Sequence, residues 1–202
     1  VDPGKATNRT VITFAGSPNA VIECAFEMIK IAAELIDMES HKGEHPRMGA
    51  TDVCPLIPIS GVTIEECIGY SIKLSKKVGS LLRIPVFLYE YSSNQKYRKN
   101  LADIRSGEYE GMEIKMQNKK WHPDFGPNIF NKKAGCTAIG VRDFLIAYNI
   151  NLNTRDKSIA TDIALDIREA GRNKRDSKGK FIRDRKGIPI KKPGKFKNVK
   201  AV

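Results

Sequence analysis

The sequence lacks several features that would place it in a membrane, a zinc module or a disulfide scaffold. No apolar run approaches the roughly 18 residues of a membrane-spanning helix. The chain has 202 residues but only three histidines and one tryptophan. Its four cysteines, Cys24, Cys54, Cys67 and Cys136, form no C-x-x-C pair, so the sequence indicates neither a zinc ribbon nor a redox motif. We expect a cytoplasmic protein with free thiols and no membrane partner.

Acidic residues are scarce at one end of the chain. The net charge is +12, but residues 168–202 hold 14 Lys or Arg against 3 Asp or Glu, whereas residues 1–167 hold 21 against 20. The basic stretch is punctuated by Gly and Pro, which predicts a flexible linker over residues 172–202. A basic nucleic-acid-binding protein is one alternative, but the nearly neutral remainder disfavours a nucleic-acid partner.

The chain opens on Val1 without a signal-peptide pattern, and no internal repeat is visible. We expect the natural N-terminus to be missing. The sequence predicts one domain over residues 1–171, followed by a linker over residues 172–202 that leads toward an absent C-terminal subdomain.

Hydrophobic periodicity predicts alternating strands and helices. Helices are expected from Pro18 to near Ile36, after the capping box Thr63-x-x-Glu66, and up to Gly171 as C-cap. Short loops or helices are expected over residues 92–133. Strands are expected over residues 10–15, 54–59, 84–91, 137–141 and 144–152. Pro55 and Pro58 would make residues 54–59 an edge strand. This order predicts an α/β (α+β) sandwich with helices packed on a mixed sheet.

Residues 37–53 show no periodicity and contain the run HKGEHPRMG at residues 41–49. The H-x-x-E-H pattern matches a zinc site in which His41 and His45 lie one helical turn apart. Such a site needs a helix, which Gly43 and Pro46 interrupt. We therefore predict a loop without a metal, and a solvated polar loop is the simplest alternative.

A functional loop would aim one imidazole into a cleft. Pro46 would fix its backbone, and Gly43 and Gly49 would allow close approach. His45 would then act as a general base, because an ordinary imidazole pKa of about 6.5 suits proton transfer near neutrality. Three acids could orient it or tune its pKa, namely Asp37, Glu44 and Asp52.

Several motifs in the chain resemble the formiminotransferase (glutamate formimidoyltransferase) family. They occur in the family's order across about residues 2–170. The motifs are NRTV at 8–11, LIDM at 35–38, HKGEHPRMG at 41–49, DVCP at 52–55, IR-x-GEYE at 104–110, W-x-PDFGP at 121–127 and FLIA-x-NINL at 144–152. The chain resembles the family's N-terminal subdomain without its first strand and helix.

This resemblance implies a ferredoxin-like fold and transfer of a formimino group between N5 of tetrahydrofolate and L-glutamate, a step of histidine degradation. It implies that His45 is the catalytic proton acceptor, that Asp2 is a second site residue, and that the protein forms a homodimer. The co-substrate would be tetrahydrofolate, with no metal. The folate-binding segment maps to Gly126, Pro127, Asn128, Ile129, Phe130, Asn131, Lys132, Lys133, Ala134 and Gly135. Ile129 and residues 131–134 depart from the family pattern.

Glutamate and folate carry carboxylates, which cationic side chains could bind. The candidates for substrate binding are Arg9, Lys42, Arg47 and Arg105. Solvated surface positions are the alternative for each. Trp121 and Phe125 would either stack on a folate ring or pack under a loop, and His122 is expected to be an exposed loop histidine. A noncatalytic folate-binding or partner subunit remains the alternative to an enzyme.

Overall fold

The computed structural model describes residues 1–146, 148 and 150–201. The chain forms two compact units, Val1–Leu145 and Ile146–Val202. None of the helices in the described residues is long and apolar enough to cross a membrane.

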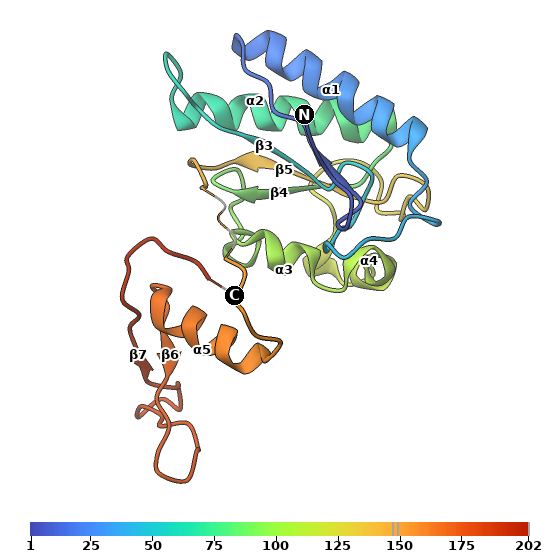
Figure 1. The fold of residues 1–202 in the computed structure, drawn as a ribbon. Helices are drawn as coiled ribbons and strands as arrows, with labels where there is room; N and C mark the ends of the chain where they lie inside the picture. The colour runs from blue at the N-terminus through green and yellow to red at the C-terminus, as the bar shows by residue number, and fades with distance from the viewer. Residues whose placement is uncertain (147, 149, 202) are drawn as a thin grey trace. The chain divides into compact units, whose positions relative to one another are not determined.

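A three-stranded parallel sheet forms the centre of the first unit (Figure 1). Its strands are β3 (Val53–Leu56), β4 (Val86–Glu90) and β5 (Thr137–Val141), in the order β3-β5-β4. Every residue of β5 is buried, as expected for a central strand with helices on both faces. The strand β3 lies at the edge of the sheet, as Pro55 within it predicts.

Helices cover both faces of this sheet (Figure 1). The helices α1 (Pro18–Leu35) and α2 (Ile64–Lys77) cover one face, and α3 (Leu101–Arg105) and α4 (Glu108–Met116) cover the other. Short helical segments occupy η1 (Val78–Leu82), η2 (Lys96–Arg98) and η3 (Lys119–Trp121). The α/β architecture that the sequence predicts is confirmed.

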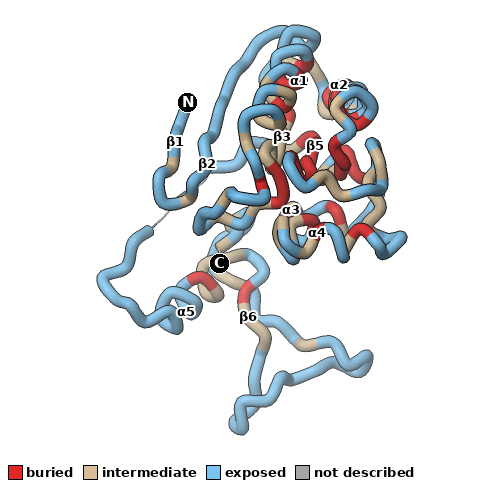
Figure 2. Tube along the Cα trace, turned by 90° about the vertical axis from the view of Figure 1, so that its right-hand side faces the viewer, coloured by how far each residue is buried: buried red, intermediate tan, exposed pale blue. Residues whose placement is uncertain are grey.

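Alternation along the strands divides the apolar side chains into two cores. Ile139 and Val141 join the core under α1 and α2, whereas Ala138 joins the core under α3 and α4. Figure 2 shows the buried residues along the strands and the inward faces of the helices. The α2 capping box is formed, with Thr63 accepting from the backbone N–H of Glu66. Ser17 precedes Pro18 at the start of α1 but makes no capping hydrogen bond.

The three strands of the main sheet pair in parallel, and antiparallel pairing occurs in isolated bridges, such as the one between Val86 and Phe125, and in separate two-stranded sheets. One of them pairs β1 (Asp2–Gly4) with β2 (Arg9–Val11), so the strand expected at residues 10–15 is displaced and shortened. The strand expected at residues 144–152 is wrong for the described residues, since none of them lies in a strand; residues 147 and 149 are outside the description. The run has strand propensity, but no strand pairs with its described residues.

The second unit contains α5 (Lys157–Ile167), β6 (Arg172–Asn173) and β7 (Lys191–Lys192). The expected last helix is confirmed, but its C-cap is Arg168, and Gly171 lies beyond it with a φ of 60°. The units divide earlier in the chain than the boundary at residue 171 that the charge distribution predicts.

An internal repeat that the sequence analysis missed lies within the basic stretch. Residues 175–182 (RDSKGKFI) and 183–190 (RDRKGIPI) form the same turn. In each, the aspartate carboxylate accepts two backbone N–H groups, Asp176 from residues 178 and 180 and Asp184 from residues 186 and 188. In each, the arginine donates to the turn glycine's carbonyl.

These turns predict a pattern of amide exchange. The backbone N–H groups of Lys174, Ile182 and Ile190 donate to the carbonyls of Ile190, Lys174 and Ile182, in a closed ring of three hydrogen bonds. We expect these amides to exchange with solvent more slowly than that of Arg185, which has no acceptor among the described residues. NMR-detected exchange on the isolated chain measures this difference. Equal, unprotected rates would show that residues 172–202 are the flexible linker that their composition predicts.

Candidate functional site

The loop that carries His45 connects α1 to β3, and residues 41–47 are neither helix nor strand. The predicted loop is confirmed. The turn of the β1–β2 hairpin lies against it. The Asn8 side chain donates to the Lys42 carbonyl at 2.7 Å, and His41 Nε2 donates to the Asn8 carbonyl at 2.9 Å. A Cβ on Gly43 would lie 2.3 Å from the Thr7 carbonyl oxygen, so this contact requires glycine.

The other end of the loop contacts the chain just before β5. Gly49 forms an isolated bridge with Gly135, and a Cβ on Gly49 would lie 2.1 Å from the Cys136 carbonyl oxygen. The Ala134 carbonyl accepts from the Ala50 N–H at 2.9 Å. The predicted close approach at Gly49 is confirmed. The histidine loop and the end of the expected folate-binding segment are therefore neighbours.

The hydrogen bonds of His45 define its tautomer. Nδ1 lies 2.6 Å from the Pro46 carbonyl, which can only accept, so Nδ1 carries the proton. Nε2 is then an acceptor, and Arg9 Nη1 donates to it at 2.5 Å. Burial lowers the pKa of His45 most, and the charges of Arg9 and Arg105 lower it further. The Pro46 hydrogen bond and Asp52 oppose this shift, and the net effect favours a neutral imidazole, the form a base requires.

Of the three acids expected to tune His45, Asp52 is the one among the main influences on its pKa, which it raises. The Asp52 carboxylate accepts from the Met48 N–H at 3.0 Å and from Arg105 Nε at 3.2 Å, and it also binds Arg105 Nη2. The Asp37 carboxylate accepts from the Glu39 N–H in the turn after α1, and Glu44 is exposed. Arg105 is thus already paired with an acid.

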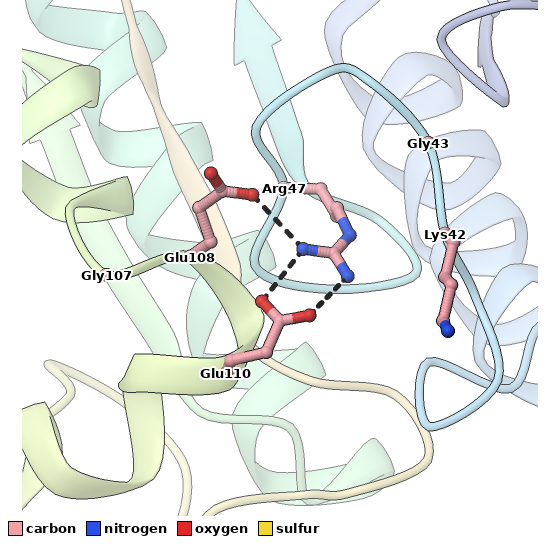
Figure 3. Close-up of a pocket in the computed structure, with 6 residues that line it drawn as sticks. All are labelled: Lys42, Gly43, Arg47, Gly107, Glu108 and Glu110. Carbon is pink, nitrogen blue, oxygen red and sulfur yellow. Dashed lines mark hydrogen bonds and ion pairs between the residues drawn. The ribbon is translucent and has the colours of Figure 1, made fainter.

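Arg47 is paired as well, and it lines a hollow of about 450 Å³ with Lys42, Gly43, Gly107, Glu108 and Glu110 (Figure 3). Its guanidinium donates to Glu108 at 3.1 Å and to Glu110 at 2.7 and 3.0 Å. These bonds fix the histidine loop to the start of α4. Lys42 lies across the hollow, and its ammonium has no hydrogen-bond partner among the described residues. Sequence reasoning missed both glutamates, although they lie in the GEYE motif.

Asp2 lies on β1, opposite Val11, and is exposed. Arg9 lies opposite Gly4 in the same hairpin. Because side chains alternate along a strand, Asp2 and Arg9 share one face of the hairpin. Asp2 makes no hydrogen bond to His45 within the described residues, so the structure brings Arg9 to His45 and places Asp2 only on the same hairpin face as Arg9.

The segment from Gly126 to Gly135 is held at both ends. Gly126 has a φ of 83°, and a Cβ there would lie 2.4 Å from the Ile84 carbonyl oxygen. Near the other end, the Tyr109 hydroxyl donates to the Lys132 carbonyl at 2.6 Å, and its ring lies 5.2 Å from that of Phe130. Between these ends Ile129 is 71% exposed.

The aromatic candidates before this segment pack within the fold. Trp121 contacts the Tyr97 ring at 5.2 Å and the Lys115 ammonium at 4.0 Å, and Phe125 packs against the core under α1 and α2. Packing under a loop is therefore the interpretation that the structure supports. His122 is half-buried, and its carbonyl accepts from the buried Arg98.

The fold and these motifs define the chain as a member of the formiminotransferase family. The family model described as the formiminotransferase domain, N-terminal subdomain, matches residues 1–142, and that of the formiminotransferase domain matches residues 147–202. The chain belongs to this family.

Three relatives show how similar the chain is to other proteins with these family names. Formimidoyltransferase-cyclodeaminase of Dictyostelium discoideum is 53% identical over 85% of this chain and 32% of its own length. The Sus scrofa protein of that name is 43% identical over 100% of this chain and 34% of its own length. Glutamate formimidoyltransferase of Streptococcus pyogenes serotype M1 is 46% identical over 81% of this chain and 55% of its own length. The chain thus spans between 32% and 55% of the length of these relatives.

The ion pairs that Arg47 makes with Glu108 and Glu110 predict a loss of folding stability at low pH. The hydrogen bond from Arg47 holds the pKa of Glu110 below its ordinary 4.5. A lowered carboxyl pKa stabilises the fold at pH values above 4.5, and this contribution disappears as the pH falls through the folded-state pKa. Because Glu110 is mostly exposed, we expect Glu110→Gln to lower the free energy of unfolding by only about 1 kcal/mol at pH 7.

Urea denaturation at pH 7 and pH 3 measures this contribution. Glu113→Gln, on the exposed side of the same helix, is the matched control and should change stability by less than about 0.5 kcal/mol. A Glu110→Gln loss that persists at pH 3, or one that Glu113→Gln equals, would contradict the assignment.

Proposed function

We propose that this chain is the N-terminal catalytic part of a glutamate formimidoyltransferase. It would transfer the formimino group between 5-formiminotetrahydrofolate and L-glutamate, in histidine degradation. The single observation that carries the proposal is the position of His45. Its Nε2 accepts a hydrogen bond, and its loop contacts the expected folate-binding segment through the bridge between Gly49 and Gly135. Relatives whose names state this activity support it.

The reaction needs one group that accepts and returns a proton. The attacking amine forms a bond to the formimino carbon and must lose a proton, while the departing nitrogen must gain one. A neutral imidazole serves the first step, and the imidazolium it becomes serves the second. The Nδ1 bond to the Pro46 carbonyl keeps Nε2 as the exchanging atom.

Folate binding would fall on Gly126 to Gly135. The support is the attachment of this segment to the histidine loop through Gly49 and Gly135, together with its exposed central residues. Tetrahydrofolate would be a co-substrate, and no step of the transfer calls for a metal. Asp2 would assist from the hairpin face that carries Arg9.

The four cationic candidates differ in whether their side chains already bind a carboxylate of the protein. Arg9 contacts a neutral imidazole, and Lys42 has no side-chain partner among the described residues, so both could bind a substrate carboxylate directly. Arg47 and Arg105 would bind substrate only by exchanging the carboxylates they hold.

We further propose that the protein acts as a homodimer in the cytoplasm, an expectation that rests on the family alone. A noncatalytic folate-binding subunit is the second candidate, because the exposed central residues of the segment 126–135 could bind folate without any transfer. Transfer assayed on this chain, and on a version extended to the relatives' length, separates the two. Activity in neither, with folate binding in both, would support the second candidate.

The proposed role of His45 as general base predicts a specific kinetic defect in a His45→Ala variant. In whichever version is active, His45→Ala should lower kcat on the order of 100-fold or more, because the proton acceptor is lost. Folate affinity should be largely kept, since the segment 126–135 is untouched. His122→Ala removes a histidine whose ring is not part of the site and is the matched control. A His45→Ala protein with near-normal turnover would rule out the assignment.

A further inference from the structure

Arg9 bonds to a group that is an unusual partner for a guanidinium. Its Nη1 donates to the neutral His45 Nε2, 36 residues away in the chain. Among the described residues no carboxylate binds Arg9, although Arg98 and Arg105 each bind one and Arg47 binds two. Charge-assisted bonds between two ionised groups are the stronger ones, so an arriving carboxylate can outcompete the imidazole for Arg9.

The hairpin that carries Arg9 is fixed where it meets the histidine loop. Asn8, with a φ of 46°, binds that loop through both its side chain and its carbonyl. The backbone of Gly43 also packs against the backbone of Thr7, since a Cβ on Gly43 would lie 2.3 Å from the Thr7 carbonyl oxygen. The backbone beside Arg9 is thus anchored, while its strand β2 is exposed. A change in the Arg9 contact therefore needs only rotation of a long, exposed side chain.

The Arg9 contact and the proposed chemistry need the same lone pair. An attacking amine must bring its nitrogen within about 2.6–3.2 Å of the base nitrogen. While Arg9 donates to Nε2, that position is filled. An imidazolium formed there would also face the guanidinium charge directly, which disfavours proton transfer.

We propose that Arg9 is a gate on His45 that a substrate carboxylate opens. In the free protein Arg9 occupies Nε2; when the dicarboxylate amino acid binds, Arg9 turns to its carboxylate and frees Nε2 for the amine. The base would then be available only when the correct substrate is present. This inference rests on the proposed function and assigns Arg9 the recognition of the amino-acid substrate.

Three charged groups act on the His45 ring, from three elements. They are Arg9 from β2, Arg105 from α3 and Asp52 just before β3. Asp52 and Arg105 bind each other and largely offset, so Arg9 is the uncompensated charge. Neutralising or withdrawing Arg9 should therefore raise the pKa of His45, because a positive neighbour disfavours the imidazolium.

The test is an NMR titration of the His45 ring, with L-glutamate as the probe and its dimethyl ester, which keeps the amine but has no carboxylate, as the control ligand. In the unaltered protein, glutamate should raise the pKa of His45 and the ester should not. Arg9→Gln should raise it without any ligand and abolish the response to glutamate. Arg9→Lys keeps the charge and should leave the ligand-free titration where it is. Arg83→Gln removes an exposed charge that makes no contact with His45 and should behave like the unaltered protein.

Kinetics in the active version gives the second readout. Arg9→Gln should raise KM for glutamate about tenfold or more, the loss expected for one charge-assisted bond, with a smaller change in kcat. A His45 titration that is identical in the unaltered and Arg9→Gln proteins, or that glutamate leaves in place, would overturn the gate. Absence of transferase activity with the titration behaving as expected would instead contradict the proposed function alone.

Discussion

The backbone contact between Gly49 and Gly135 is the constraint on which the site depends. Side chains at these positions would overlap backbone atoms of Cys136 and Met48, so the histidine loop can lie against the entry to β5 only with glycine in both. The loop itself leads into β3, the strand beside β5. The site is therefore built at the amino ends of the strands, whereas open parallel sheets usually bind ligands beyond their carboxyl ends.

Electrostatics reinforces this placement. The Asp52 carboxylate binds Arg105 and the Met48 N–H, and Asp124 likewise binds Arg98 and the Leu88 N–H. Each aspartate thus joins an arginine of the α3 side to the backbone of the sheet or its entry loop. Because these pairs are partly or wholly buried, losing one partner would leave an uncompensated charge, which is costly. The α3–α4 side of the sheet, which carries Glu108 and Glu110, is therefore held to the sheet and its entry loop by both of these ion pairs.

The parts that local chemistry determines could be predicted from the sequence. The helix α2 has its capping box and apolar stripe, and the loop at residues 41–47 contains Gly43 and Pro46, which are incompatible with a helix. The strand predicted at residues 144–152 was wrong because apolar alternation indicates a preference for a strand but does not identify the strand that would pair with it. The repeat at residues 175–190 was missed because its equivalence lies in turn hydrogen bonds around Asp176 and Asp184. The bond from Arg9 to His45 could not be predicted, since it depends on how the hairpin meets the loop.

The cationic candidates differ in what a substitution at each position would reveal. Arg47 and Arg105 hold the histidine loop and the α3–α4 layer through carboxylates, so removing either would disturb the position of His45 whether or not it touches substrate. A loss of activity there could not be assigned to binding. Neither Lys42 nor Arg9 binds a carboxylate in the part of the chain that the structure describes, and the hairpin is anchored by Asn8 and Gly43 rather than by Arg9. Substitutions at Lys42 and Arg9 therefore test recognition of the substrate with the scaffold intact, and only Arg9 does so in contact with the proposed base.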